Sequence, residues 1–518
     1  MLTTFTAPAF AKTWYIENGD ITISAGKTEG TNKVSQGSTT DEEDTDTVIT
    51  NNNRDTASSH TVTIDAGNDK VEVTLKDVNI KADSGSALTS NGDVTLTLKG
   101  ENHLTGGNGD IYGGDGITSS GSLTISGGTV TATGGNNTGS DGSGGSGIYS
   151  VSGSVTISGG TVNATGGEGS KNNSTSGGSG IYSDSGDVTI SGGTVNANGG
   201  NGGTISGGDG ICSSGGVTIS SGSTVTANGG SGEDGSGGRG ITSNGGVTVS
   251  GGTVNAKGGS GKNGNGGDGI LSFNPVAISG GTVNANGGNS DYSNGGDGIR
   301  SLDHVAISGG TVKSNGGSGN LSGGNGIISY DIDLSGSLEL TAKAGSPNGK
   351  ALSRAGKELD LNTIKDKLGP GAKVTVTDAN GKVNQVSIPR PVEPEEPVIP
   401  EESSSSSDGG SATSSAPASP FPGLTVTDKD GQRISYTSTQ SGNTLTVCVG
   451  RFTASFRISL ATLRQLRAEG IDTITFQTIL CSTTLSVDEL LAMGGEDTEV
   501  VLTHHIRSST LTVGGKAV

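Results

Sequence analysis

The chain has 518 residues, of which 28% are hydrophobic, 3% are aromatic and 97 are glycine. This composition excludes one large globular core of the ordinary kind. The net charge of −20, from 31 basic and 51 acidic residues, argues against nucleic acid or an anionic membrane surface as a partner. Three cysteines do not make a disulfide framework.

The first segment, residues 1–11, ends in Ala9-Phe10-Ala11, a small-residue pattern typical of a signal-peptide cleavage site. We interpret it as the remnant of a signal peptide, although an unstructured terminus fits the same residues. The interpretation predicts a secreted or cell-surface protein. No segment is long and apolar enough to span a bilayer, so we expect no membrane insertion.

Residues 12–110 are predicted to form an N-terminal cap and the degenerate first coils of a repeat. Residues 71–80 have the strand–corner–strand rhythm of the later copies, and Leu88 precedes Ile117 by one period. Atypical terminal coils are expected where a column of repeats must be capped. The acidic run Asp41–Asp46 predicts a solvated loop.

Residues 111–388 repeat one pattern: G-G-x-G-I-x-S, then V-x-I-S-G-G-T-V, then x-A-x-G-G. The isoleucines that open the copies are 28 to 33 residues apart: Ile117, Ile148, Ile181, Ile211, Ile241, Ile270, Ile299 and Ile327. Each copy holds three short alternating runs, as in Ile211–Ser213, Val217–Ile219 and Thr224–Ala227. Stacked copies bury such small residues when each strand pairs with its equivalent ~4.8 Å away. The period therefore predicts a mainly β chain folded as a parallel β-helix. Intrinsic disorder, the main alternative, has no need of this register.

Two ladders of hydroxyl residues recur in the copies, and we expect both at inward positions. The serines are Ser119, Ser150, Ser183, Ser213, Ser243, Ser272, Ser301 and Ser329; the threonines are Thr129, Thr161, Thr194, Thr224, Thr253, Thr282 and Thr311. Their hydroxyls can satisfy one another and the backbone of the turns. The copies differ mainly in the segment before each G-G-x-G-I, which predicts one face of variable loops.

Residues 389–423 are rich in proline, glutamate and serine, which predicts an extended, unfolded linker. Residues 424–518 change character and predict a small α+β domain. Ser459 begins a predicted helix that ends at Gly470, and Ser486 opens a capping box before a second helix. Strands are predicted around these helices, at residues 445–449, 471–476, 499–502 and 511–513. Cys448 and Cys481 either pair, if the protein is exported, or remain free thiols.

The stretches TWYIENGDITISAG, VTLKDVNIKA and DVTLTLKGENHLTGG, and the repeated GGDGI with VTISGGTVNANGG, carry a resemblance. Over residues 12–345 the chain resembles secreted bacterial carbohydrate-binding β-helix proteins, whose fold is similar to the pectate-lyase-like right-handed parallel β-helix. The resemblance implies non-catalytic, often calcium-associated binding of plant cell-wall polysaccharides such as cellulose or pectin. We expect a monomer that binds polysaccharide. The right hand also agrees with the general chirality of parallel crossovers.

Two sets of residues are candidate sites. Tyr149 and Tyr182 occupy equivalent outward positions in adjacent coils and predict a platform for sugar rings, or a stack that only stabilises the sheet. The residue between the glycines of G-G-x-G-I is an aspartate in half of the copies: Asp115, Asp209, Asp268 and Asp297. Carboxylates among turn carbonyls suit Ca²⁺, and simple turn preference is the alternative. Asp268 and Asp297 lie in consecutive coils and are the first choice for Ca²⁺.

Two other functions fit the same pattern. A polysaccharide lyase needs a base and a positive charge beside a uronate, and Arg300, His304 and Lys313 share one coil. The positions of these residues on different strands or corners argue against convergence, and paired acids for glycoside hydrolysis are not evident. A structural adhesin or spacer needs no small-molecule site. We therefore expect a carbohydrate-binding protein that is not an enzyme.

Overall fold

The computed structural model describes residues 11–389 and, with short gaps, residues 424–517. The chain forms two compact units, which divide between residues 395 and 396. Residues 1–10 and 390–423 hold almost all of the predicted signal remnant and linker, and they lie outside the described residues. Among the described residues, no helix is long and apolar enough to cross a membrane.

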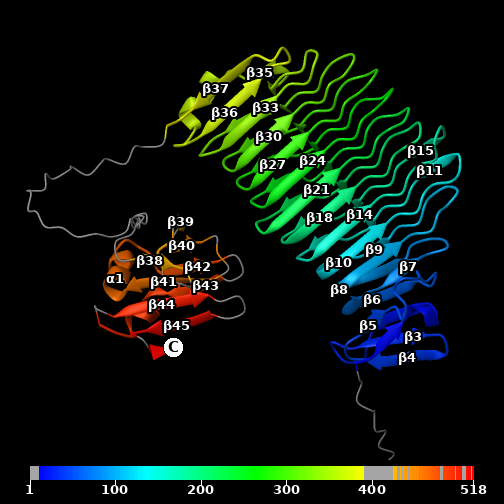
Figure 1. Cartoon of the computed structure of the whole chain (residues 1–518), viewed down its shortest axis with the longest axis horizontal. Helices are drawn as coiled ribbons and strands as arrows, with labels where there is room; N and C mark the ends of the chain where they lie inside the picture. The colour runs from blue at the N-terminus through cyan, green and yellow to red at the C-terminus, as the bar shows by residue number, and fades with distance from the viewer. Residues whose placement is uncertain are drawn as a thin grey trace, which may run out of the picture. The chain divides into compact units, whose positions relative to one another are not determined.

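The first unit is a right-handed parallel β-helix with three strands in each coil (Figure 1). In one coil these are β19 (Ile211–Ser213), β20 (Val217–Ile219) and β21 (Ser223–Asn228). Each strand pairs in parallel with its equivalent in the next coil, so that Ile211 lies opposite Ile241. The fold class and the three-strand coil are thus confirmed.

The equivalent strands form three sheets, named here by their order in the coil. The first-strand sheet holds β9 (Ile117–Ser120), β12 (Ile148–Ser150), β16 (Ile181–Ser183), β19, β22 (Ile241–Ser243), β25 (Ile270–Ser272), β28 (Ile299–Ser301), β31 (Ile327–Ser329) and β34 (Leu352–Arg354). The second-strand sheet holds β13 (Val155–Ile157), β17 (Val188–Ile190), β20, β23 (Val247–Val249), β26 (Val276–Ile278), β29 (His304–Ile307) and β32 (Asp331–Leu334). The third-strand sheet holds β14 (Thr161–Thr165), β18 (Gly193–Asn198), β21, β24 (Thr253–Lys257), β27 (Thr282–Asn286), β30 (Thr311–Asn315), β33 (Glu339–Lys343) and β36 (Lys373–Thr377). The long strand β10 (Leu123–Thr133) supplies both the second and the third strand of its coil. Two short strands, β11 (Asp141–Ser143) and β15 (Ser174–Ser176), pair on the variable loops.

The core is a column of isoleucine, valine and alanine side chains that are fully buried, as in Ile211, Val225 and Ala227. The serine ladder lies inward as predicted, and its hydroxyls donate to turn carbonyls: Ser213 Oγ is 2.8 Å from the Gly186 carbonyl oxygen. The prediction for the threonine ladder was wrong. Since Val225 and Ala227 point inward, strand alternation places Thr224 on the outer face.

Glycine recurs at the corners because neighbouring coils approach too closely there for a side chain. A Cβ on Gly238 would lie 1.9 Å from the Gly208 carbonyl oxygen of the preceding coil. Gly159, by contrast, faces open space. The glycine content is therefore a packing requirement at most corners, not a mark of disorder.

The N-terminal end of the solenoid combines parallel strands of the first coils with three antiparallel strands that cap them. Its elements are β1 (Thr13–Tyr15), the 3₁₀ turn η1 (Ile16–Asn18), β2 (Ile21–Ala25), β3 (Asn32–Gln36), β4 (Thr39–Asp44), β5 (Val48–Thr50), β6 (Val62–Lys76), β7 (Asn79–Lys81) and β8 (Leu88–Thr105). The loop predicted at Asp41–Asp46 was wrong for Asp41–Asp44, which belong to β4, although Asp41 and Glu42 are solvent-exposed as predicted. Asp44 is buried and accepts hydrogen bonds from Trp14 Nε1 at 2.7 Å and the backbone N–H of Lys12 at 3.1 Å. These buried partners, and not solvent, fix the acidic strand.

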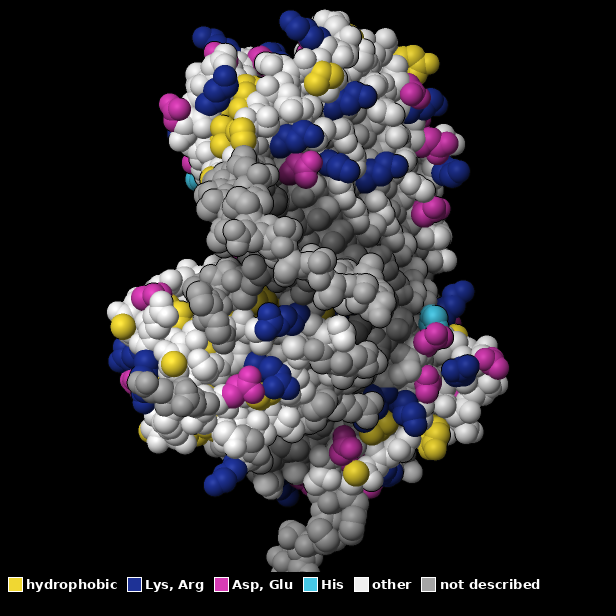
Figure 2. All heavy atoms as spheres, turned by 60° about the vertical axis from the view of Figure 1, so that its left-hand side comes forward, with side chains coloured by type: hydrophobic (Ala, Val, Ile, Leu, Met, Phe, Trp, Pro, Cys, Tyr) yellow, Lys and Arg dark blue, Asp and Glu magenta, His cyan; other side chains and the backbone are white. Residues whose placement is uncertain are grey.

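The C-terminal end of the solenoid is closed by β35 (Lys357–Glu358), the 3₁₀ segment η2 (Leu361–Lys367) and β37 (Val383–Ser387), which pairs with β36. Figure 2 shows Lys and Arg side chains gathered over this end. Residues 343–389 hold eight Lys and Arg against four Asp and Glu, whereas the whole chain is acidic. This end of the solenoid therefore carries the opposite sign of charge to the chain as a whole.

The second unit is the predicted small α+β domain. One sheet holds β38 (Leu424–Thr427), β41 (Ala454–Ser459), β44 (Glu499–His504), β45 (Ser509–Val513) and β46 (Lys516–Ala517), and the other holds β39 (Thr437–Ser441), β40 (Thr444–Cys448), β42 (Thr473–Gln477) and β43 (Ser482–Ser486). The helices α1 (Leu460–Ala468) and α2 (Val487–Leu491) begin at the predicted caps, Ser459 and Ser486. Cys448 Sγ donates to Gln477 Oε1 at 3.5 Å, and Cys481 lies outside the described residues, so the pairing of these cysteines stays a prediction.

Candidate functional site

The two tyrosines predicted as a platform are stacked. Tyr149 on β12 lies opposite Tyr182 on β16, with ring centroids 5.2 Å apart and ring planes 12° from parallel. The Tyr182 hydroxyl donates to Asp184 Oδ1 at 2.6 Å, so one ring is fixed by a carboxylate. Burial, together with this carboxylate, raises the pKa of Tyr182. The stack is confirmed, and contact with a sugar stays a prediction.

The outward column of the first-strand sheet changes character beyond the tyrosines. Its other members are Thr118, Cys212, Thr242, Leu271, Arg300 and Ile328. Burial, and next the neighbouring Asp209 carboxylate, raises the pKa of the Cys212 thiol to about 12. The raised pKa favours the protonated thiol near neutral pH and argues against a nucleophilic role for Cys212.

The aspartates between the corner glycines connect successive coils. Asp115, Asp209, Asp268 and Asp297 each accept, through Oδ1, the backbone N–H of the equivalent residue one coil further on, at 2.6–2.7 Å. Asn325 does the same for Lys350 at 3.0 Å. These bonds give the recurring aspartates a structural role that simple turn preference does not describe. In each case a backbone N–H that points along the axis of the solenoid donates to a side-chain oxygen of the preceding coil.

Asp268 and Asp297 line a groove of about 340 Å³, named here the corner groove, together with Arg239, Arg300 and Asn325. Both carboxylates are buried. Burial, and next the Asp297 charge, raises the pKa of Asp268 to about 6, and burial raises that of Asp297 as well. Arg300 Nη1 lies 3.6 Å from Asp297 Oδ2.

This donor set does not fit a calcium ion well. Ca²⁺ is usually bound by about six to eight oxygen atoms. Here Oδ1 of each aspartate already accepts a backbone N–H, and the Arg300 guanidinium faces Asp297. Within the described residues, no group of three or more His, Cys, Asp or Glu side chains is placed to hold a metal ion. Binding of Ca²⁺ at these aspartates, expected from the residues and from the resemblance, stays a prediction.

Sequence reasoning missed an exposed apolar stripe beside the corner groove. Phe273, Leu302 and Tyr330 each follow the inward serine of a coil, in three consecutive coils. Their side chains are 47%, 43% and 76% exposed. The sequence offers one sign of this stripe. The position after the inward serine is polar in three earlier coils, as Asp184, Ser214 and Asn244, and is apolar in these three coils.

The three residues considered for a lyase lie on three different sheets. Arg300 is on β28, His304 opens β29 and Lys313 is on β30. Arg300 faces Asp297, and His304 Nδ1 lies 3.4 Å from Asp303 Oδ2. Because the three sheets face different directions, their outward side chains do not meet at one point. The structure therefore does not bring this set together.

The comparison with protein families agrees with the fold. A model described as a beta helix repeat matches residues 123–147 and 276–299. Each match begins at the second strand of one coil; the first ends just before the first strand of the next coil, and the other ends at the first residue of that strand. No curated protein and no solved structure gave a match to the chain. By its repeats and by the register of its coils, the chain is a parallel β-helix protein.

Proposed function

We propose that the solenoid is a non-catalytic polysaccharide-binding module that works outside the cell. The ligand lies along the first-strand face, defined as the outward residues of the first-strand sheet and the residue after each inward serine. This face runs from Tyr149 and Tyr182 at one end to Phe273, Leu302 and Tyr330 at the other. It is elongated along the axis, as a linear polymer requires.

The observation that carries the proposal is the exposed stripe beside a polar groove. Pyranose rings have apolar faces that pack on aromatic and aliphatic side chains, while their hydroxyls bind carboxylates, amides and guanidinium groups. Leu302 and Tyr330 offer the first kind of surface, and Arg300 and Asn325 in the corner groove offer the second. Arg300 lies on β28, and Leu302 and Tyr330 directly follow β28 and β31.

The spacing of the stripe suits an extended glucan. Phe273 and Tyr330 lie two coils apart, ~9.6 Å along the axis. A β-1,4-linked glucan presents every second ring in the same orientation at a similar distance, so both rings can pack on one chain. The tyrosine stack lies about three coils before Phe273, ~14 Å away, and extends the same track.

The absence of catalysis is supported by how the candidate acids and bases are used. The Asp268 and Asp297 carboxylates each accept a backbone N–H, and the three basic residues of one coil point from different sheets. A general acid or base must instead reach a scissile bond. The proposal therefore predicts binding with no change in polymer length.

The test is a pull-down of the full chain on insoluble cellulose and pectin, with Ca²⁺ and with chelator, while released sugars and unsaturated products are followed. The double variant Phe273→Ala/Tyr330→Ala should lose most of its binding to cellulose. The matched control, Tyr112→Ala/Tyr292→Ala, removes two exposed rings from the variable loops, which are 71% and 61% exposed, and should bind normally. Released products would make the protein an enzyme, and no binding to any glycan would favour a spacer or adhesin.

A further inference from the structure

A second groove, of about 620 Å³, lies on the N-terminal coils, away from the first-strand face. Tyr15, Thr50, Lys76 and Lys99 line it in four successive strands, β1, β5, β6 and β8. Their register places them in one column along the axis, one residue per coil. Arg54 and Asp77 complete its polar wall, and these six residues define the N-terminal groove.

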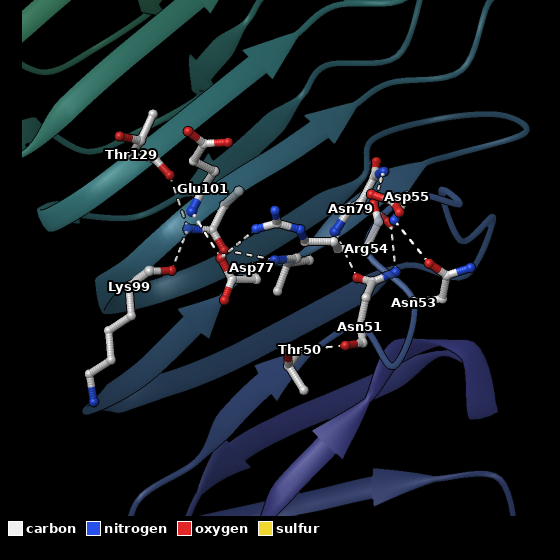
Figure 3. A network of polar contacts seen from close by, with 12 residues as sticks. Thr50, Asn51, Asn53, Arg54, Asp55, Asp77, Asn79, Lys99, Glu101 and Thr129 are labelled. Atoms are coloured by element: carbon white, nitrogen blue, oxygen red, sulfur yellow. Dashed lines mark hydrogen bonds and ion pairs between the residues drawn. The ribbon is translucent and has the colours of Figure 1, made fainter.

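The loop that carries Arg54 is held to the solenoid by hydrogen bonds between side chains and backbone groups (Figure 3). Asn51 Oδ1 accepts the N–H of Asn79 at 2.7 Å, and Asn79 Nδ2 donates to the Arg54 carbonyl oxygen at 2.8 Å. Glu17 Oε1 accepts the N–H groups of residues 52 and 53 at 2.8 and 3.0 Å. Burial acts to raise the pKa of Glu17, but these N–H groups lower it overall, so the anchor stays ionised. The groove is built before any ligand arrives.

The charge of the groove is positive although the chain is acidic. Arg54 Nη1 lies 3.9 Å from Asp77 Oδ1, which also accepts the Glu101 N–H at 3.2 Å. Lys76 and Lys99 are exposed, lie opposite each other and have no ion pair among the described residues. Three cations against one lining carboxylate leave two positive charges in excess.

Two like charges opposite each other on neighbouring strands destabilise a sheet. An anion bound between the two ammonium groups replaces this repulsion with attraction to both of them. A lysine ammonium is a point charge that donates a short charge-assisted hydrogen bond equally well to a carboxylate or a sulfate oxygen. Tyr15, 40% exposed at the end of the column, adds a ring on which a sugar can pack.

We infer that the N-terminal groove binds a linear anionic glycan, with Lys76 and Lys99 on anionic groups of neighbouring sugars and a further sugar against Tyr15. The coil spacing of ~4.8 Å brings the two ammonium groups to the separation of anionic groups carried one per sugar. The inference rests on the proposed function only in that the ligand is a glycan. The site itself is on another part of the solenoid.

The test measures binding of the full chain to polygalacturonate, which carries only carboxylates, to iota-carrageenan, which carries only sulfates, and to neutral mannan, at low and high salt. The double variant Lys76→Gln/Lys99→Gln should bind the anionic glycans about tenfold more weakly or worse, and high salt should have the same effect on the wild type. The control Lys257→Gln/Lys313→Gln removes two exposed lysines from the third-strand sheet and should bind as the wild type does. Preference between the first two polymers identifies carboxylate or sulfate as the natural anion.

Three results would overturn the inference: no binding to either anionic glycan, unchanged binding by Lys76→Gln/Lys99→Gln, or equal weakening of the control. Equally tight binding of a thymidine oligonucleotide would also overturn it, since the groove would then recognise charge alone. The variant Phe273→Ala/Tyr330→Ala separates the two proposals. It should lose binding to cellulose and keep binding to polygalacturonate. Binding at the first-strand face and binding at the N-terminal groove are thus measured independently.

Discussion

Asp268 Oδ1 accepts a hydrogen bond from the backbone N–H of Asp297, 2.7 Å away in the next coil. One carboxylate thereby joins two coils of the solenoid at a corner. Asn325 makes the equivalent bond to Lys350 without a charge. The corner therefore needs an acceptor but does not need an anion, and this difference can be measured.

The pH dependence of stability should report on Asp268. Burial, and next the Asp297 charge, raises the pKa of Asp268 to about 6 in the folded state. An unfolded aspartate has a pKa of about 3.9, so the stability contributed by the protonated carboxyl is complete below about pH 4 and is lost as pH rises through about 6. Asp268→Asn keeps an oxygen that can accept the Asp297 N–H, and it removes the loss of stability with rising pH. We expect the variant to be more stable than wild type by about 1–3 kcal/mol at pH 7.5 and nearly equal at pH 4.

The check is thermal or urea unfolding at both pH values, followed by the fluorescence of Trp14, the single tryptophan, which lies in the solenoid. Asp291→Asn, an exposed change on a variable loop, is the control and should not alter the pH dependence. A destabilised Asp268→Asn at pH 7.5 would mean that the charge itself is needed at this corner.

The corner glycines predict a sharp contrast between two similar substitutions. Gly238→Ala places a Cβ 1.9 Å from the Gly208 carbonyl oxygen, so the coils must move apart. We expect a loss of about 3 kcal/mol or more in the free energy of unfolding. Gly159→Ala meets nothing within 4 Å and should change stability little. Equal effects in urea unfolding would contradict the packing role of the glycines.

The inward serines give a second matched pair. Ser243 Oγ donates to the carbonyl oxygens of Gly246 and Gly215 at 2.8 and 2.9 Å, whereas Ser272 Oγ is buried without a hydrogen-bond partner. Ser243→Ala should cost about 1–3 kcal/mol because it removes these bonds and also the acceptor of the Gly246 N–H, which lies 3.1 Å from Ser243 Oγ. Ser272→Ala should be neutral or stabilising. Chemical unfolding of both variants decides this, and a larger loss for Ser272→Ala would contradict it.

The N-terminal cap should depend on Asp44. Removal of its carboxylate in Asp44→Ala leaves Trp14 Nε1 and the Lys12 N–H without acceptors in a buried place. We expect a loss of about 1–3 kcal/mol, seen as earlier exposure of Trp14 in fluorescence-detected unfolding. Asp41→Asn, an exposed change on the same strand at a positive φ of 50° that asparagine tolerates, should leave the midpoint unchanged. The same Trp14 signal in both variants would show that β4 does not hold the cap.

The repeat made most of the fold predictable. Because Ile211 recurs as Ile241, equal residues at equal positions specify the strand register of every central coil. The threonine ladder was misplaced for a simple reason. Its position relative to Val225 and Ala227 implies the outer face, because recurrence of a residue does not by itself indicate burial.

The candidate sites were less predictable, because they depend on contacts between coils and on residues outside the motif. The hydrogen bond from Asp297 to Asp268 is invisible until the corner geometry is known. Phe273 and Tyr330 follow the motif and do not belong to it, so a search of the repeated positions passes over them. Lys76 and Lys99 lie in irregular coils, where no repeated motif indicates that they are opposite each other on neighbouring strands.

The most direct measurement of the central claim is calorimetric titration of a soluble β-1,4-gluco-oligosaccharide into the full chain and into Phe273→Ala/Tyr330→Ala. Our account predicts saturable binding by the wild type, loss of that binding in the double variant and no shortening of the oligosaccharide. Absent binding by the wild type, or equal binding by the double variant, would contradict the assignment of the first-strand face as a glycan site.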